Sequence, residues 1–183
     1  MICEKHLYKE DLYRFYGKKK LNIKEKINMS QEMKYIVLFR KVQETRNPIK
    51  KLILKIRLRR KQNKTQIQIS YRTKIGKGFY IGHLGRIIIN PETTIGNNCN
   101  IATGVTIGQI NKGKKKGCPT IGDCVWIGTN SVIVGKVNIG NNVLIAPGAY
   151  VNFDVPDNSI VIGNPGIIHH NMEATKGYID NKV

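Results

Sequence analysis

The sequence predicts a mainly β fold, a parallel solenoid of stacked six-residue strands behind a small α-helical N-terminal domain. The first observation is that aliphatic residues recur every six positions between Ile69 and Val151. The second is the glycine that directly follows many of them, and the third is the helical spacing of apolar residues before residue 66. In a solenoid, each aliphatic side chain points inward and stacks on its equivalent one coil later, while glycine eases the corners.

Three runs of Ile and Val carry the period of six. They are Ile69, Ile75, Ile81 and Ile87; Ile89, Ile95, Ile101 and Ile107; and Ile121, Ile127, Ile133, Ile139, Ile145 and Val151. An amphipathic helix repeats every 3.6 residues and a hairpin sheet every two, so neither accounts for this spacing. The length of the repeat predicts about four or five coils.

Two interruptions of the period predict local departures from the coil. The frame slips by two residues between Ile87 and Ile89, close to His83. Ile107 and Ile121 are fourteen positions apart, so we expect residues 109–120 to leave the solenoid as a loop. The predicted division is a helical domain at 1–66, the solenoid at 67–168 and a C-terminal tail at 169–183.

Helix signals mark the N-terminal part. We expect helices at residues 11–17, ended by Gly17, and at Gln31–Thr45, ended by the Asn47-Pro48 pair. A third is predicted from the spacing of Ile49, Leu52, Ile53 and Ile56. From about residue 166 we expect a loop or strand with an exposed end.

Charge is concentrated in the first 66 residues, which hold 20 Lys and Arg against 6 acidic residues, a net charge of +14. Such a balance indicates either a polyanionic partner or simply a Lys-rich surface. No nucleic-acid-binding motif accompanies it, so no nucleic acid partner is expected. The four cysteines show no CxxC pairing, and the N-terminus lacks a signal-peptide apolar stretch, which favours a cytoplasmic protein.

The repeat [LIV]-G-x4 resembles the hexapeptide-repeat acyltransferases. Two segments, KIGKGFYIGHLGRIIINPETTIGNNCNIATGVTIG (74–108) and CPTIGDCVWIGTNSVIVGKVNIGNNVLIAPGAYV (118–151), look similar to the serine acetyltransferase branch, as does VPDNSIVIGNPG (155–166). The resemblance implies a left-handed parallel β-helix, acetyl-CoA as co-substrate and a homotrimer with active sites between neighbouring subunits. It also implies that His83 is the catalytic base.

Two departures from serine acetyltransferases shape the predicted acceptor. That family has an aspartate fifteen residues before the histidine, where this chain has Gln68, and a second histidine where this chain has Cys118. The pattern therefore looks more like the enzymes that O-acetylate sugars of bacterial capsule or O-antigen, and we expect a polysaccharide O-acetyltransferase. The alternatives are a serine O-acetyltransferase of cysteine biosynthesis, an N-acetyltransferase acting on an amino sugar, and a non-catalytic scaffold. If the acceptor is a lipid-linked glycan, the basic N-terminal part is expected to attract anionic lipid at the inner membrane face.

Candidate site residues follow from the chemistry of acetyl transfer. A histidine titrates near neutral pH, so the His83 imidazole can remove the acceptor's hydroxyl proton. Gln68 is the candidate partner of that imidazole. His83 is the only histidine inside the repeat, so no metal is expected. Predicted acetyl-CoA contacts are Gly108, as an oxyanion donor, and Lys114, Trp126, Thr129, Ala146 and Pro147; predicted acceptor contacts are Tyr71, Tyr80 and Arg86.

Overall fold

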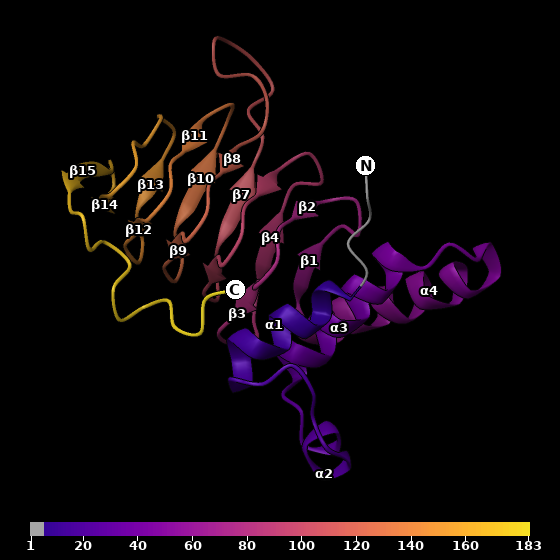
Figure 1. The fold of residues 1–183 in the computed structure, drawn as a ribbon. Helices are drawn as coiled ribbons and strands as arrows, with labels where there is room; N and C mark the ends of the chain where they lie inside the picture. Colours follow the sequence, from indigo (N-terminus) through magenta and orange to yellow (C-terminus); the bar gives the residue numbers. More distant parts are fainter. Residues whose placement is uncertain (1–5) are drawn as a thin grey trace.

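The computed structural model describes residues 6–183, which form four helices followed by a parallel β-solenoid (Figure 1). The helices are α1 (Leu7–Tyr16), α2 (Ile23–Ile27), α3 (Gln31–Glu44) and α4 (Pro48–Thr65). The predicted helices are confirmed, with α1 beginning four residues earlier than expected and α2 not foreseen. Within residues 6–183, no helix is long and apolar enough to cross a lipid bilayer.

Three sheets form the sides of the solenoid, and each of the first four coils contributes one short strand to each sheet. The first sheet contains β1 (Ile67–Ile69), β4 (Ile87–Ile89), β7 (Thr106–Gly108), β10 (Val132–Val134) and β13 (Tyr150–Val151). The second contains β2 (Lys74–Ile75), β5 (Thr94–Ile95), β8 (Thr120–Ile121) and β11 (Asn138–Ile139). The third contains β3 (Tyr80–Ile81), β6 (Asn100–Ile101), β9 (Trp126–Ile127), β12 (Val143–Ile145), β14 (Ser159–Ile162) and β15 (Ile167–His170).

The period of six stacks aliphatic residues in three buried columns, which confirms the solenoid prediction. One column runs through the third sheet, where Ile81 pairs with Ile101, Ile101 with Ile127, and Ile127 with Ile145. These side chains are no more than 1 % exposed. The core is therefore a narrow stack of branched side chains that fills the space between the sheets, and a rigid prism follows from its close packing.

The structure departs from the regular coil at both predicted interruptions, although the first lies before Ile88 and not between Ile87 and Ile89. The two extra residues fall in the turn between β3 and β4, which holds His83 and Gly85. The segment between β7 and β8 leaves the solenoid as a loop, closed at its base by paired hydrogen bonds between Ile110 and Gly117. Its tip carries Lys112, Lys114, Lys115 and Lys116, all exposed.

A buried ion pair joins the helices to the first coil. Arg40 of α3 donates from Nε to Asp11 of α1 at 2.8 Å, and both side chains are almost fully buried. The same guanidinium donates to the carbonyl oxygens of Ile75 and Gly76 at 2.7 and 2.5 Å. Asp11 also accepts from the Phe79 N–H at 2.8 Å. This network fixes α1 and α3 on the turn of the solenoid next to β2.

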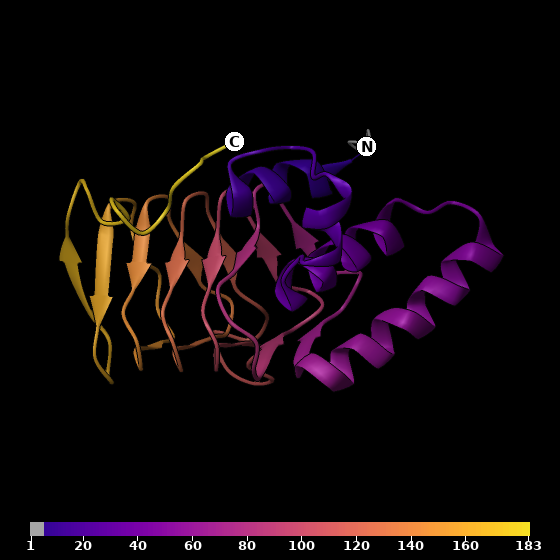
Figure 2. The same cartoon turned by 90° about the horizontal axis from the view of Figure 1, so that it is seen from below.

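Helix α4 lies at the end of the molecule opposite β14 and β15 (Figures 1 and 2). Its Leu54 and Leu58 are buried, whereas the four residues that predicted the helix are exposed. The helix prediction is therefore confirmed, but the most regular apolar stripe of the helix faces away from the rest of the chain.

The tail after β15 returns along the outside of the third sheet (Figure 2). Ala174 and Ile179 are buried there. Val183 exchanges two hydrogen bonds of 2.8 Å with the side chain of Asn98. Most tail residues, including Asn181 and Lys182, are exposed, as the sequence predicts, but these long-range contacts, which it does not predict, hold the tail on the solenoid. Strand β15 also runs across the boundary predicted between residues 168 and 169.

Candidate functional site

The candidate site lies around one corner of the prism and the groove beside it. The corner is the turn that joins the third sheet to the first sheet in each coil, and we call it the His83 corner. It contains residues 82–86, 102–105, 128–131 and 146–149 of successive coils. The turns stack directly, since Gly148 donates to the Thr129 carbonyl at 2.8 Å and Asn130 to the Thr103 carbonyl at 3.1 Å. His83, Thr129, Ala146 and Pro147 therefore share one edge of the molecule.

The stacked turns leave little room at the His83 corner. Gly104 has φ of +78°, and a Cβ there would lie 1.9 Å from Oδ1 of Asn130. Gly85 has φ of +134°, and a Cβ there would lie 2.2 Å from Oγ1 of Thr103. Glycine is therefore required at both positions, and the close stacking fixes the backbone next to an exposed His83.

A carboxylate that the sequence analysis missed reaches the same turn. Glu32, at the start of α3, accepts a hydrogen bond from the Leu84 N–H at 3.0 Å. This contact ties the residue after His83 to the helical part of the chain. The two residues are 52 positions apart, and no local pattern in the sequence could have paired them.

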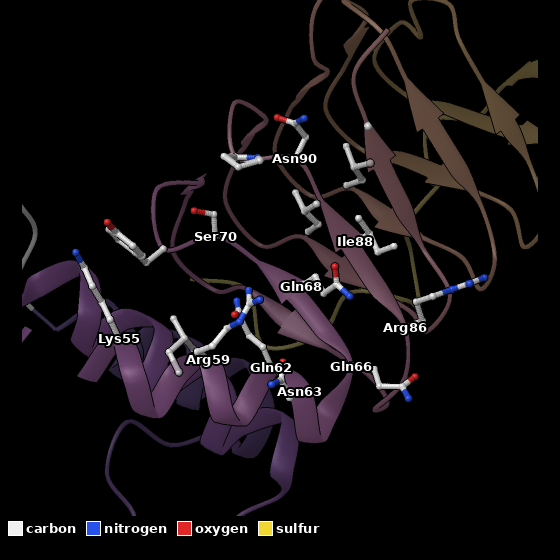
Figure 3. Close-up of a pocket in the computed structure, with 16 residues that line it drawn as sticks. Lys55, Arg59, Gln62, Asn63, Gln66, Gln68, Ser70, Arg86, Ile88 and Asn90 are labelled. Carbon is white, nitrogen blue, oxygen red and sulfur yellow. The ribbon is translucent and has the colours of Figure 1, made fainter. Parts of the chain in front are cut away.

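A groove of about 920 Å³ runs between α4 and the outer face of the first sheet. It brings together four of the predicted residues, Gln68, Tyr71, Arg86 and Gly108. Gln68 and Arg86 are labelled in Figure 3. Gln68 points outward from β1 between the buried Ile67 and Ile69. Arg86 lies at the edge of the groove, and its side chain extends away from α4 (Figure 3).

The groove is positively charged. Lys55 and Arg59 of α4 line it together with Arg86, and its lining includes no acidic residue. Lys55 Nζ lies 4.6 Å from the centre of the Tyr71 ring, and hydrogen bonding from Lys55 lowers the pKa of Tyr71. The arrangement favours an anionic ligand, such as a carboxylate or a phosphate. Lys55 and Arg59 were not predicted, because helical spacing alone does not reveal which side of α4 faces the solenoid.

The position of Cys118 is also beside the groove. The Cys118 thiol lies 4.0 Å from Oε1 of Gln109, and that oxygen accepts from the Asn90 amide at 3.2 Å. Asn90 lines the groove. Burial raises the pKa of the Cys118 thiol. A protonated thiol is a weak hydrogen-bond donor, so this position interacts with ligands less strongly than an imidazole would.

The remaining predicted residues lie elsewhere. Tyr80 and Trp126 point outward from the third sheet, where Tyr80 packs on Phe15 of α1 at a ring distance of 4.2 Å. Trp126 packs on Tyr178 of the tail at 4.8 Å. Lys114 is exposed on the loop between β7 and β8. The single chain therefore gathers the groove residues and the corner residues, but brings neither Tyr80 nor Trp126 to them.

Comparison with known proteins identifies the repeat. Residues 118–152 match the family model described as bacterial transferase hexapeptide (six repeats). The chain is 39 % identical over 102 residues to serine acetyltransferase of Bacillus licheniformis, covering 56 % of this chain and 47 % of that protein. It is 41 % identical over 104 residues to serine acetyltransferase of Staphylococcus epidermidis, with 57 % and 49 % covered. The chain thus spans about half the length of these curated relatives.

Solved structures extend the similarity to the helices. The Neisseria gonorrhoeae serine acetyltransferase in complex with serine matches 90 % of this chain and 68 % of its own, with a TM-score of 0.73 and 26 % identity. The Brucella abortus serine acetyltransferase in complex with coenzyme A matches 90 % and 66 %, with a TM-score of 0.72. At 22 % identity, the second comparison shows the fold alone.

These relatives overturn the predicted acceptor. The expectation of a polysaccharide O-acetyltransferase was wrong, because the matching curated proteins and structures are serine acetyltransferases. That expectation depended on two side chains, Gln68 and Cys118, whereas the similarity to serine acetyltransferases extends over about a hundred positions. By its repeats and its architecture, this chain has the hexapeptide-repeat β-solenoid of the serine acetyltransferases, with a small helical N-terminal region.

Proposed function

We propose that this protein is an acetyl-CoA-dependent serine O-acetyltransferase in which His83 acts as the general base. The observation that carries the proposal is the 39 % identity to a serine acetyltransferase over 102 residues. The positively charged groove beside the His83 corner supports it, since it suits the carboxylate of an amino acid or the phosphates of CoA. We propose a homotrimer in which CoA lies between neighbouring solenoids.

The chemistry requires one proton to move in two steps. The imidazole of His83 removes the proton from the acceptor hydroxyl as its oxygen attacks the thioester carbonyl carbon. The tetrahedral intermediate then collapses, the C–S bond breaks, and the imidazolium returns the proton to the leaving sulfur. A backbone N–H at Gly108 is the proposed donor to the developing oxyanion. No acyl-enzyme is needed, because the acetyl group passes directly from sulfur to oxygen.

The residues that bear positive charge fit acetyl-CoA and serine at separate places. CoA carries several phosphate charges, and Lys114, at the exposed tip of the loop, is the proposed partner of one of them. Arg86, three residues after His83, borders the groove and is the proposed partner of the serine carboxylate. Gln68 lies in the same groove, where its amide is the proposed partner of the catalytic imidazole.

The test is thiol release from acetyl-CoA with L-serine as acceptor, compared with D-serine, L-threonine, L-homoserine and a panel of sugars. We expect release with L-serine well above hydrolysis, and light scattering should give about three times the 20.7 kDa mass of one chain. Release that depends on a sugar and not on L-serine would refute the proposal. Acetylation of an amino sugar at nitrogen would refute it equally.

Two substitutions should separate the acceptor from the co-substrate. In Arg86→Gln, we expect the KM for L-serine to rise about 10-fold or more while the KM for acetyl-CoA stays nearly constant, because a charge-assisted hydrogen bond is lost. In Lys114→Gln, we expect the opposite pattern, with a KM for acetyl-CoA about 3-fold higher, since an exposed charge contributes less. Steady-state kinetics with each substrate varied in turn is the measurement. Identical shifts of both constants in both variants would contradict these assignments.

A further inference from the structure

An exposed apolar stripe runs along α4. Ile49, Leu52, Ile53 and Ile56 follow one another at helical spacing and are 72, 60, 54 and 49 % exposed. Buried Leu54 and Leu58 occupy the opposite side of the helix. Four large aliphatic side chains in one line are more than the scattered apolar residues of an ordinary surface, so the stripe indicates a binding partner.

Positive charge borders the stripe on both sides. Lys55 and Arg59 open onto the groove beside the first sheet, whereas Arg57, Arg60 and Lys64 line a second groove between α3 and α4. The helix contains eight Lys and Arg residues in all and no acidic residue. Long cationic side chains on both flanks of an apolar stripe are typical of helices that lie in the interface of a bilayer.

The second groove adds uncompensated positive charge next to the stripe. It has a volume of about 1240 Å³, with Val37, Leu38 and Leu54 among its apolar lining residues. Lys34, Lys61 and Lys64 also line it, and Glu44 is its one acidic lining residue. Burial, together with repulsion from Lys34 and Lys64, lowers the pKa of Lys61. An anionic headgroup in this groove would relieve that repulsion.

We propose that α4 docks this protein on an anionic lipid surface, with the stripe inserted among the acyl chains and the flanking cations against the headgroups. Charge complementarity favours lipid over a second copy of this chain. Two α4 helices packed face to face would repel each other, because each carries eight positively charged side chains. It also favours lipid over nucleic acid, which would leave the aliphatic stripe in water. Helix α4 lies at one end of the molecule (Figures 1 and 2), and all four residues of the stripe are exposed in the single chain.

The test is sedimentation of the full-length protein with vesicles of phosphatidylcholine, with and without one third phosphatidylglycerol. We expect binding to the anionic vesicles that weakens with salt, and little binding to pure phosphatidylcholine. The pair Ile53→Ser and Ile56→Ser should weaken binding by about 10-fold or more, because two inserted side chains are lost. The pair Arg57→Gln and Arg60→Gln should weaken it to a similar extent and reduce the salt dependence.

A matched control is Ile167→Ser, which removes an isoleucine that is 62 % exposed from β15 at the far end of the solenoid. It should bind vesicles as the wild type does. The proposal is overturned if the protein does not sediment with anionic vesicles, or if it binds a DNA duplex instead. It is also overturned if the Ile53 and Ile56 substitutions change the mass measured by light scattering but leave vesicle binding unchanged. None of these measurements uses catalysis, so they fail or succeed independently of the proposed acetyl transfer.

Discussion

Replacing His83 by alanine is expected to lower kcat for serine-dependent thiol release by at least about 100-fold, because general-base catalysis contributes roughly 10²–10⁴ in rate. The KM for acetyl-CoA should change little, since His83 acts on the acceptor. The acid-side limb of the pH–rate profile should disappear as well, because the group whose protonation stops the reaction is gone. Stopped assays across pH with both substrates saturating would show this.

The control for this prediction is His169→Ala, which removes an exposed histidine from β15 and should leave the rate unchanged. Circular dichroism would confirm that both variants keep the solenoid. A His83→Ala protein with a rate within a few-fold of the wild type would remove the base from the mechanism. If the wild-type protein also releases no thiol when L-serine is added, the two results together would favour a non-catalytic scaffold.

Replacing Arg40 by methionine is expected to cost about 3–5 kcal/mol of unfolding free energy, because it leaves the buried Asp11 carboxylate without its counterion. Two hydrogen bonds to the carbonyls of Ile75 and Gly76 are lost as well. Urea denaturation followed by circular dichroism is the measurement. Lys19→Met is the control: it breaks the exposed pair with Glu10 and should cost at most about 1 kcal/mol.

The pH dependence of this variant has a definite sign. Burial raises the pKa of Asp11, and the Arg40 guanidinium opposes that rise. Without Arg40 the folded state binds a proton more readily than the unfolded chain does, so the unfolding free energy should increase as pH falls from neutrality. The double change Asp11→Leu and Arg40→Met should regain much of the lost stability. A loss under about 1 kcal/mol in Arg40→Met would show that the pair contributes little.

The solenoid could be predicted from the sequence because its cause is local and periodic. Each Ile six positions after the last must face the same interior, so the run of Ile69, Ile75 and Ile81 reveals the buried side of the coil without any long-range information. The loop between β7 and β8 was predictable for the same reason, as an interruption of a known period.

The parts that the sequence did not predict depend on contacts between distant residues. Glu32 meets the turn of His83 across 52 positions, and Asn98 holds Val183 across 85. The stripe on α4 predicted a helix but not its exposure, because spacing cannot tell a core from an unpartnered surface. The acceptor could not be predicted from Gln68 and Cys118, since two side chains constrain a substrate less than the whole repeat does.

The last strand has a consequence for assembly. All other ladders of the solenoid are parallel, whereas β15 runs antiparallel to β14 along its full length. A coil of another chain, arriving in the parallel sense, meets a strand of reversed direction there and finds the wrong pattern of donors and acceptors. At the opposite end, α4 occupies the space that a preceding coil would take (Figure 2). The protein is thereby protected from end-to-end polymerisation into fibres.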